Sequence, residues 1–287
     1  MLIDTHAHLN IAAFDKDRDE VIKRCFENKI SMINIGTNLE TSKKAVELVE
    51  KYPSDIYASI GLHPINLDTG LLKRKVDKLE GGSFETEFDY QKYKELALQH
   101  GSGKAKSKVV AVGEVGLDYY LKPKTTGKKI LFKEKQKELL LQEIKLAQEL
   151  NLPVIFHCRM AHEDLLKILI SNFKFQISKL SGVVHGFVGT AEELEKYLEM
   201  GFYIGFNGII FKKIEGIDFV GNIKRTPLEK ILIETDCPYL KAPDFPEERN
   251  NPLGVKLVAE YIAKIKKISF EDISNITTKN AQTLFRL

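Results

Sequence analysis

The chain contains no tryptophan, only three cysteines and no long apolar run. Its cysteines are Cys25, Cys158 and Cys237, and their odd number and wide spacing argue against a disulfide framework and indicate a reducing compartment. No apolar stretch approaches the length of a transmembrane helix, and Asp4 and His6 leave no room for the apolar region of a signal peptide. We therefore expect a soluble protein without membrane contact, located in the cytoplasm, with the nucleus as the alternative.

Charge of one sign is also scarce, because the net charge is only +3. This mild excess neither requires nor excludes a phosphate-rich partner. A hydrophobic fraction of 43% and a charged fraction of 29% are those of an ordinary globular protein. The 287 residues are enough for a (β/α)8 barrel, which takes roughly 250 residues as one unit. Composition therefore permits a single domain over residues 1–287.

Short apolar runs that are typical of buried strands alternate with segments of helical periodicity. The first strand begins at Leu2, and further strands are predicted at residues 32–35, 56–61, 109–114, 154–157, 182–185, 203–206 and 231–234. Helices are predicted at residues 17–29, 40–51, 89–99, 132–150, 162–172, 191–200, 253–267 and 270–285. This alternation predicts a parallel α/β fold, a (β/α)8 TIM barrel, with an open doubly wound sheet as the alternative.

The alternation pauses after the third strand, where residues 66–107 are predominantly polar. The pair Gly81-Gly82 and the segment 101–103 break this stretch, and a helix is predicted between them at residues 89–99. The segment has too few apolar residues for a core of its own. We expect an elaborated loop of the barrel, with a helix in it, rather than a second domain.

Histidines and carboxylates gather directly after the predicted strands. These residues are His6, His8, His63, Glu114, His157, His185, Glu234 and Asp236. Barrel active sites are built at the C-terminal ends of several strands at once. A buried structural histidine is the commoner explanation for any one of them, but five of the seven histidines share this placement. The shared placement, rather than any single residue, predicts a site.

The donor set is too rich for one tetrahedral ion that keeps an open position. Three or four imidazoles with two carboxylates fit a pair of divalent ions, which sit about 3.5–4 Å apart in such sites. Glu114 is the natural bridge between two ions, and Asp236 can bind one ion and accept the proton of the attacking water. Mixed nitrogen and oxygen ligands accept Mg²⁺, Mn²⁺ or Zn²⁺, so the ion stays open.

Other polar residues carry weaker signals. Arg159 and Arg249 follow predicted elements on the same face, and each could clamp a phosphate or form an ordinary surface ion pair. Cys158 is expected to be a packed thiol, because adjacent strand residues point to opposite faces. His162 could face the site or the solvent, and His100 is expected at the surface.

Three segments resemble, in order, the signatures of the TatD family. They are Asp4-Thr5-His6-Ala7-His8, Gly61-Leu62-His63-Pro64 and Gly113-Glu114-Val115-Gly116-Leu117-Asp118-Tyr119-Tyr120. The resemblance continues at residues 153–159, 184–187, 234–240 and 249–252, and so spans nearly the whole chain. Residues 157–159 and 203–208 resemble the eukaryotic branch in particular. Members of this family are metal-dependent deoxyribonucleases with an amidohydrolase-like barrel.

The resemblance implies a role for each matching residue. One ion would be held by His6, His8, Glu114 and Asp236, and the second by Glu114, His157 and His185. His63 and Arg249 would contact the scissile phosphate or its neighbours. Three points of comparison with the family matter. The insertion at 66–107 is longer than in compact bacterial relatives, and Asn251 stands where the family often has an acidic residue. This chain also keeps the pair His6 and His8, which some eukaryotic relatives lack. No role is assigned to Asn251.

We therefore predict a metal-dependent deoxyribonuclease that hydrolyses DNA phosphodiester bonds with a two-metal-activated water. Its partner would be single-stranded DNA or a 3′ end, and only the family likeness suggests 3′-5′ exonuclease direction. An aminoacyl-tRNA deacylase or an amidohydrolase on the same centre is the enzymatic alternative, and a non-catalytic metal-binding scaffold the other. A lysine on the fourth strand would have favoured a typical amidohydrolase, but Glu114 stands there. The sequence leaves the oligomeric state open.

Overall fold

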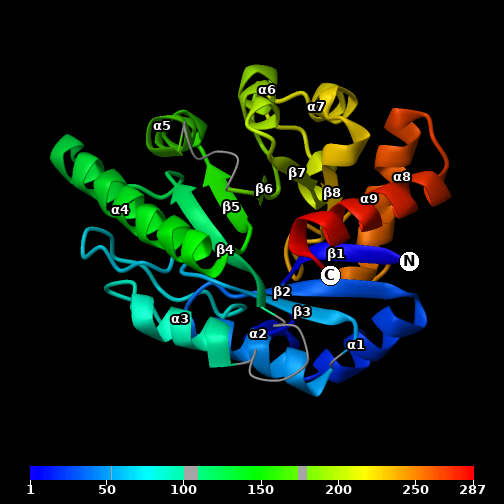
Figure 1. The fold of residues 1–287 in the computed structure, drawn as a ribbon, viewed down its shortest axis with the longest axis horizontal. Coiled ribbons are helices and arrows are strands. Elements are labelled where there is room, and N and C mark those ends of the chain that lie inside the picture. The colour runs from blue at the N-terminus through cyan, green and yellow to red at the C-terminus, as the bar shows by residue number, and fades with distance from the viewer. Residues whose placement is uncertain (53, 100–108, 174–179) are drawn as a thin grey trace.

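Eight parallel strands, each hydrogen-bonded to the next along the chain, form one sheet in the order β1 to β8 (Figure 1). The computed structural model describes residues 1–52, 54–99, 109–173 and 180–287. The strands are β1 (Leu2–Ala7), β2 (Ile30–Ile35), β3 (Ile56–Ile60), β4 (Val109–Asp118), β5 (Val154–Arg159), β6 (Gly182–Val184), β7 (Tyr203–Phe206) and β8 (Ile231–Ile233). Ala7 pairs with Cys237 just beyond β8, so the first and last strands meet and the sheet nearly closes. The predicted TIM barrel is confirmed, and the doubly wound alternative is wrong.

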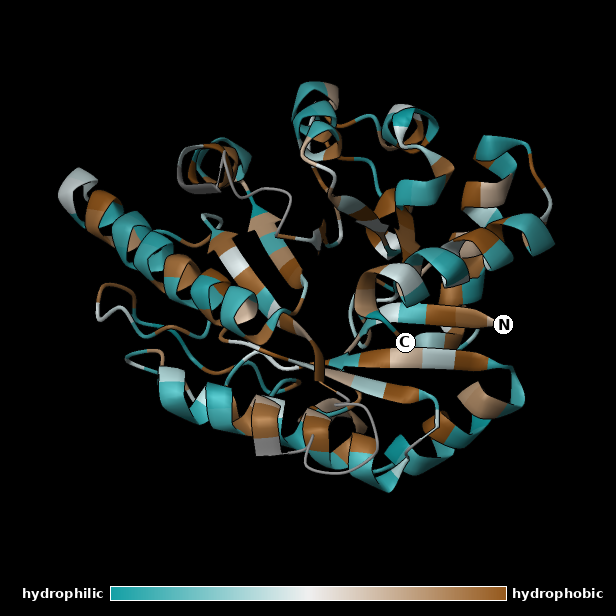
Figure 2. Ribbon diagram, in the orientation of Figure 1, coloured by the Kyte–Doolittle hydropathy of each residue, from teal (hydrophilic) through white to brown (hydrophobic). Residues whose placement is uncertain are grey.

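Helices alternate with the strands and cover the outside of the barrel (Figures 1 and 2). They are α1 (Arg18–Glu27), α2 (Leu39–Lys51), α3 (Tyr90–Gln99), α4 (Thr126–Leu150), α5 (His162–Phe173), α6 (Ala191–Glu199), α7 (Phe219–Arg225), α8 (Val255–Lys266) and α9 (Phe270–Phe285). Short 3-10 turns lie at Ala12–Phe14, Gly208–Phe211, Leu228–Lys230 and Pro252–Gly254. Every residue of β1, β2 and β4 is buried. This burial explains why the strands read as continuous apolar runs rather than as alternating ones.

The barrel interior is filled at one end only. Ile33 of β2, Ile155 of β5 and Leu232 of β8 belong to an inner apolar cluster that also contains Leu284 and Phe285 of α9. Helix α9 therefore closes the end of the barrel at which the strands begin. The opposite end, where the strands finish, is left for the polar residues that follow them.

The inserted segment packs onto the barrel. Phe88 and Tyr93 are buried with their ring centroids 4.5 Å apart, and they join the main apolar core. Glu80 accepts hydrogen bonds from Thr37 after β2 and from Asn66 after β3. The predicted helix is confirmed as α3 (Tyr90–Gln99), and the described part of the insertion shares the barrel's core.

Three elements differ from the sequence-based expectation. Strand β4 runs on to Asp118, so Glu114 lies within the strand and not at its end, at a shift of register against β5. Helix α4 begins at Thr126 instead of residue 132, because its first turns carry the exposed residues Ile130 and Leu131 and have no buried stripe to predict them. Helix α7 (Phe219–Arg225) was not predicted, since it is only seven residues long.

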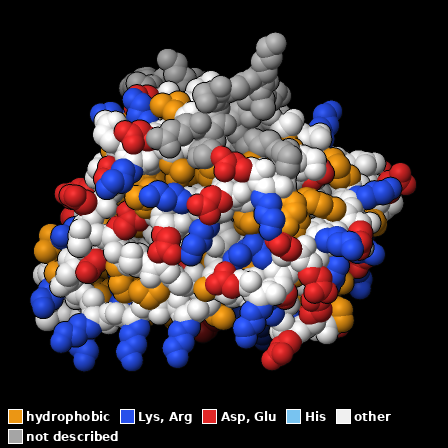
Figure 3. All heavy atoms as spheres, turned by 90° about the horizontal axis from the view of Figure 1, so that it is seen from below, with side chains coloured by type: hydrophobic (Ala, Val, Ile, Leu, Met, Phe, Trp, Pro, Cys, Tyr) orange, Lys and Arg blue, Asp and Glu red, His pale blue; other side chains and the backbone are white. Residues whose placement is uncertain are grey.

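The outer surface is mixed in charge. Figure 3 shows a face turned away from that of Figure 1, and acidic and basic side chains are interspersed over it. In the described part of the chain, no helix combines the length and the apolar character needed to cross a bilayer.

Candidate metal centre

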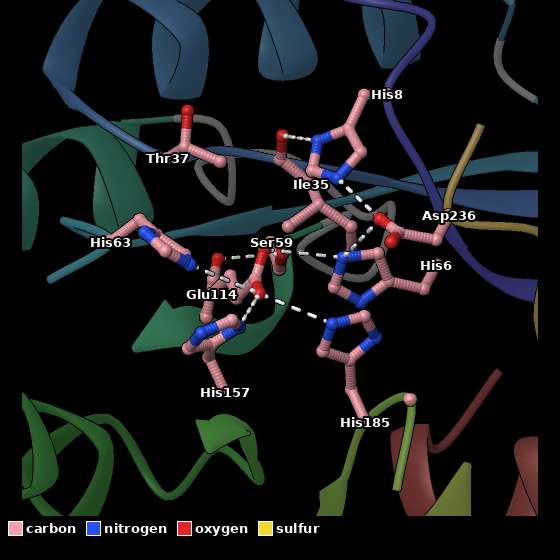
Figure 4. A network of polar contacts seen from close by, with 12 residues as sticks. His6, His8, Ile35, Thr37, Ser59, His63, Glu114, His157, His185 and Asp236 are labelled. Atoms are coloured by element: carbon pink, nitrogen blue, oxygen red, sulfur yellow. Dashed lines mark hydrogen bonds and ion pairs between the residues drawn. The ribbon is translucent and has the colours of Figure 1, made fainter. Parts of the chain in front are cut away.

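Six predicted side chains converge at the end of the barrel where the strands finish (Figure 4). They are His6, His8, Glu114, His157, His185 and Asp236, and they come from β1, β4 and β5 and from the segments directly after β1, β6 and β8. His63, from the segment after β3, joins them. The structure therefore brings together seven of the eight polar residues that follow the predicted strands, and the eighth, Glu234, lies directly behind His185.

Glu114 lies at the middle of this cluster. Its Oε2 is 3.3 Å from Nε2 of His6. Its Oε1 is 2.8 Å from Nδ1 of His157 and 3.2 Å from Nε2 of His185. His63 Nε2 approaches the same Oε1 at 3.4 Å. One buried carboxylate thus touches imidazoles from four parts of the barrel, as expected of a bridging ligand.

Asp236 completes the β1 side of the cluster. Its Oδ1 is 3.3 Å from Nε2 of His8 and 3.8 Å from Nε2 of His6. The Asp236 amide donates to the His6 carbonyl oxygen at 2.8 Å, which ties the segment after β8 to β1. Its side chain is 17% exposed, against 6% for Glu114. Asp236 is therefore the carboxylate of the pair that water can reach more easily.

The second nitrogen of each imidazole decides which nitrogen can bind a cation. His8 Nδ1 lies 3.3 Å from the Ile35 carbonyl oxygen, so Nδ1 carries the proton and Nε2 keeps its lone pair. His185 Nδ1 lies 3.2 Å from Glu234, and the same reasoning leaves Nε2 free to bind. In His157 the order is reversed, because Nε2 donates to Asp118 at 2.9 Å and Nδ1 faces Glu114. In the neutral form all three rings present a lone pair to the centre of the cluster. Burial would lower the pKa of each ring, but the facing carboxylates raise it, so the proton on this nitrogen must leave before a cation binds.

His63 has the opposite arrangement. Its Nδ1 accepts a hydrogen bond from the Ile65 amide at 3.0 Å, so the proton of the neutral ring is on Nε2. Nε2 therefore points an N–H group at Glu114 instead of a lone pair. His63 is a hydrogen-bond donor in this site, although it also lies within a group of possible ligands with Glu114 and His157.

The donor atoms fit divalent cations. Three groups of side chains place one ligand atom each within 4.8 Å of one another: His6 with Glu114 and His185, His6 with His8 and Asp236, and His63 with Glu114 and His157. Both ring nitrogens of His6 are buried without a hydrogen-bond partner among the described residues. A buried polar atom normally has a partner, and a bound cation would satisfy this one. Nitrogen and carboxylate oxygen together suit Zn²⁺ or Mn²⁺.

The charge states follow from burial and from the neighbours. Burial alone would raise the pKa of Glu114, but the surrounding imidazoles of His63, His185 and His6 and the contact with His157 lower this pKa well below its ordinary value. Burial would likewise raise the pKa of Asp236, but its contact with His8 and the charges of His185 and His6 lower it. Both carboxylates are therefore ionised near neutral pH. In contrast, burial and the charge of His185 lower the pKa of His6, which keeps that ring neutral.

No individual role is predicted from the sequence for two carboxylates behind the cluster, although Glu234 is among the polar residues that follow the strands. Asp118, at the end of β4, accepts from His157 and from Arg159, whose Nη2 is 2.7 Å away. Glu234 accepts from His185 and from the Gly186 amide at 2.9 Å. Both lie within segments that carry other site residues, so the sequence could have identified them as candidates. Their contacts with histidines 39 and 49 residues away could not be predicted from it.

A cavity of about 1310 Å³ opens from this cluster to the surface. Its lining includes His8, His63, Glu114, His157, His185 and Asp236. On one side the lining continues to Lys73, Arg74 and Lys75 of the insertion and to Tyr120 and Arg159. The candidate centre therefore lies in an open cavity whose lining carries both basic and acidic groups.

The remaining sequence candidates lie elsewhere or have structural partners. Arg249 is not among the residues that line this cavity, and its guanidinium contacts the Ala13 carbonyl oxygen and Asp17 and lies over the Phe14 ring. Cys158 is a buried thiol, as expected. His162 is buried and lies in the lining of the cavity, but its ring nitrogens are within hydrogen-bond distance of the Tyr197 hydroxyl and the Val188 carbonyl oxygen, each at 3.0 Å, so it has structural partners. His100 lies outside the described residues.

Known proteins resemble the chain over its whole length. A family model described as TatD related DNase matches residues 3–286. The uncharacterized metal-dependent hydrolase YabD of Bacillus subtilis is 39% identical over 289 residues, with 100% of both chains covered. The 3′-5′ ssDNA/RNA exonuclease TatD of Shigella flexneri is 31% identical, with 99% of this chain and 98% of that protein covered.

Solved structures of TatD homologues also resemble the chain over nearly its whole length. The crystal structure of YJJV, a TatD homolog from Escherichia coli, is 27% identical, with a TM-score of 0.78 and coverage of 100% of this chain and 98% of that chain. A TatD family hydrolase from Entamoeba histolytica is also 27% identical, with a TM-score of 0.78 and coverage of 99% and 97%. A bacterial and a eukaryotic structure match equally well, so the special likeness to the eukaryotic branch stays a prediction.

Proposed function

The chain belongs to the TatD related DNase family, and from this premise we propose that it is a metal-dependent nuclease acting on single-stranded DNA or RNA. Cleavage would proceed from the 3′ end, in line with the printed name of the exonuclease TatD of Shigella flexneri. The observation that carries the proposal is the position of Glu114 between imidazoles on both sides, with the unpartnered nitrogens of His6 beside it. A phosphodiester is the substrate for which a bridged pair of cations is best suited.

We assign the ligands by the available lone pairs. One cation would be held by His6, His8, Glu114 and Asp236, and the other by Glu114, His157 and His185. Two divalent ions, when bound, supply Lewis acidity to the phosphoryl oxygen and lower the pKa of the attacking water. The choice among Mg²⁺, Mn²⁺ and Zn²⁺ is left to the experiment below.

Asp236 would act as the general base. Its carboxylate is ionised near neutral pH and is more exposed than Glu114, so it can accept the proton of a water that enters from the cavity. His63 would donate its Nε2–H to a non-bridging oxygen of the scissile phosphate, because its Nδ1 is already an acceptor. Arg249 stays outside this assignment, since its guanidinium contacts Asp17 and Ala13.

The test uses purified protein, 3′- and 5′-labelled single-stranded DNA and RNA, and Mg²⁺, Mn²⁺ or Zn²⁺ added singly to chelator-treated enzyme. We expect metal-dependent shortening from the 3′ end. Glu114→Gln is the inactive control, because an amide cannot bridge two cations with two anionic oxygens. An aminoacyl-tRNA in a parallel reaction tests ester cleavage without a phosphodiester.

Absence of any cleavage above the Glu114→Gln control with all three metals would contradict the nuclease proposal. Release of the amino acid from aminoacyl-tRNA, with both oligonucleotides intact, would replace it by a deacylase. Cleavage of both labelled strands within the chain, without shortening from the 3′ end, would leave a nuclease but reject the exonuclease direction.

A further inference from the structure

An exposed aromatic ring stands on the rim of the cavity. Tyr120 follows β4 directly and is 59% exposed, although its neighbour Tyr119 is buried. Leu121 and Met160, which also line the cavity, are 44% and 65% exposed. Single exposed apolar residues are common on proteins, but these three line one cavity that also contains the polar centre. A ligand that enters the cavity can contact them there.

The ring is held in place by charged groups behind it. The Arg159 guanidinium carbon lies 4.6 Å from the centre of the Tyr120 ring, a cation–π contact. Arg159 itself donates to Asp118 through Nε at 2.8 Å and Nη2 at 2.7 Å. The Tyr120 amide donates to the other oxygen of Asp118 at 2.9 Å. Backbone and guanidinium are thus fixed by one buried carboxylate.

The same carboxylate connects the ring to the metal centre. Asp118 accepts from Nε2 of His157, whose Nδ1 faces Glu114 at 2.8 Å. Asp118 therefore contacts both the Tyr120 backbone and His157, a proposed metal-binding imidazole. Lys73 and Lys75, both exposed, lie in the lining of the same cavity, which also contains acidic residues such as Asp164. The two lysines can contact individual phosphates, although the lining as a whole is mixed in charge.

We propose that Tyr120, backed by Arg159, is a stacking platform for a base of single-stranded nucleic acid next to the bond that is cleaved. The inference rests on the proposed function and adds the residue that distinguishes a base-bearing strand from a bare phosphodiester backbone. Stacking suits this site because every base has a π-face, whereas base pairing in a duplex hides that face. Leu121 and Met160 would contact the edge of the stacked base or its sugar.

The test measures binding separately from cleavage. Fluorescence anisotropy in chelator-containing buffer, where no cleavage occurs, gives the Kd of a short labelled thymidine oligonucleotide and of an abasic oligomer with the same number of phosphates. We expect Tyr120→Ala to raise the Kd for the thymidine strand by about tenfold or more and to leave the Kd for the abasic strand unchanged. Tyr120→Phe should keep wild-type affinity, because stacking needs the ring and not the hydroxyl.

Tyr203→Ala is the matched control. Tyr203 is the first residue of β7, at the opposite end of the barrel, and Lys230 lies over its ring at 4.5 Å. The Tyr203→Ala substitution therefore removes a tyrosine that also has a cation over its ring but lies far from the cavity. The Kd values for both oligomers should equal those of the wild type.

Equal thymidine-strand Kd values for wild type and Tyr120→Ala would overturn the platform, even if the enzyme cleaves DNA. The same holds if Tyr120→Ala weakens both oligomers equally. Conversely, Tyr120-dependent binding without metal-dependent cleavage would uphold the platform and reject the nuclease. The two proposals therefore fail in different measurements.

Discussion

The two sides of Glu114 hold their imidazoles in different ways. On the β5–β6 side, the ring nitrogen that faces away from Glu114 donates its N–H to a carboxylate: His157 donates to Asp118 and His185 donates to Glu234. On the β1–β8 side, His8 donates to a neutral backbone carbonyl, that of Ile35. His6 has no hydrogen-bond partner among the described residues.

This difference predicts unequal binding. A carboxylate partner makes an imidazole a stronger ligand and fixes its orientation. The β5–β6 side should therefore hold its cation more tightly than the β1–β8 side. The β1–β8 side has instead the more exposed carboxylate, Asp236, which can take part in proton transfer. We infer a division of labour, with an anchoring side and a reacting side.

The largest effect is expected from removing the exposed carboxylate of the reacting side. Asp236→Asn should lower kcat on single-stranded DNA by about 10²–10⁴-fold, the usual contribution of a general base. The anchoring side should keep its cation, because Asp236 lies 3.3–3.8 Å from His8 and His6, on the other side of the cluster. Steady-state kinetics at saturating metal, with metal analysis of the same sample, tests both statements. A variant within tenfold of wild-type kcat would show that Asp236 is not the base.

Substitution of His63 tests whether this ring is a hydrogen-bond donor and not a metal ligand. Because its Nε2 carries the proton, His63→Gln should keep the full complement of metal and lose about a hundredfold in kcat, as for removal of one transition-state donor. The matched comparison is His157→Gln, which should lose a cation. Metal content by elemental analysis and kcat on DNA distinguish the two. Loss of a cation from the His63 variant would make it a ligand.

The carboxylates behind the anchoring side should have a smaller effect. Asp118→Asn and Glu234→Gln are each expected to weaken metal binding by about 10–100-fold. Asp164→Asn is the control, because Asp164 also lines the cavity but bonds Tyr119 and Lys137 rather than a histidine. Competition with a chromophoric chelator measures the affinities. Equal affinities for the Asp118 and Asp164 variants would remove the anchoring role.

The smallest effect on catalysis is expected from Glu143, which contacts the backbone next to His63. Burial raises the pKa of Glu143 well above its ordinary value, although the Leu62 amide donates to it at 2.8 Å. Above the ordinary pKa of a glutamate, the folded chain thus keeps a proton that the unfolded chain has released. The free energy of unfolding therefore falls with rising pH, by at most about 1.4 kcal/mol per unit, until Glu143 ionises in the folded chain. Glu143→Gln should make this slope shallower and leave kcat within a few-fold. Urea unfolding at several pH values decides, and an unchanged slope would contradict the protonated state.

Most of the fold could be read from local patterns. The eight strands were predictable because a parallel barrel buries both faces of each strand, and runs such as Val109–Ala111 or Ile231–Ile233 are apolar throughout. Local patterns fail where an element has no buried stripe, as in the first turns of α4. They also fail for β4, whose continuation beyond Glu114 depends on pairing with β5.

The convergence of the site was predictable for a topological reason, since parallel strands end at the same rim. Partners across the barrel were not. Arg249 finds Asp17 232 residues away, and Asp118 serves both His157 and Arg159. The sequence alone also showed no stacking platform, because only the structure reveals that Tyr120 is exposed while Tyr119 is buried.

The central claim is that Glu114 joins two cation sites of unequal strength. Titration of Zn²⁺ into chelator-treated protein, followed by competition with a chromophoric chelator, tests it most directly. We expect two ions per chain with clearly different Kd values, and we expect a His6→Ala, His8→Ala double variant to keep only the more tightly bound ion. A single ion in the wild type, or two ions in the double variant, would contradict it.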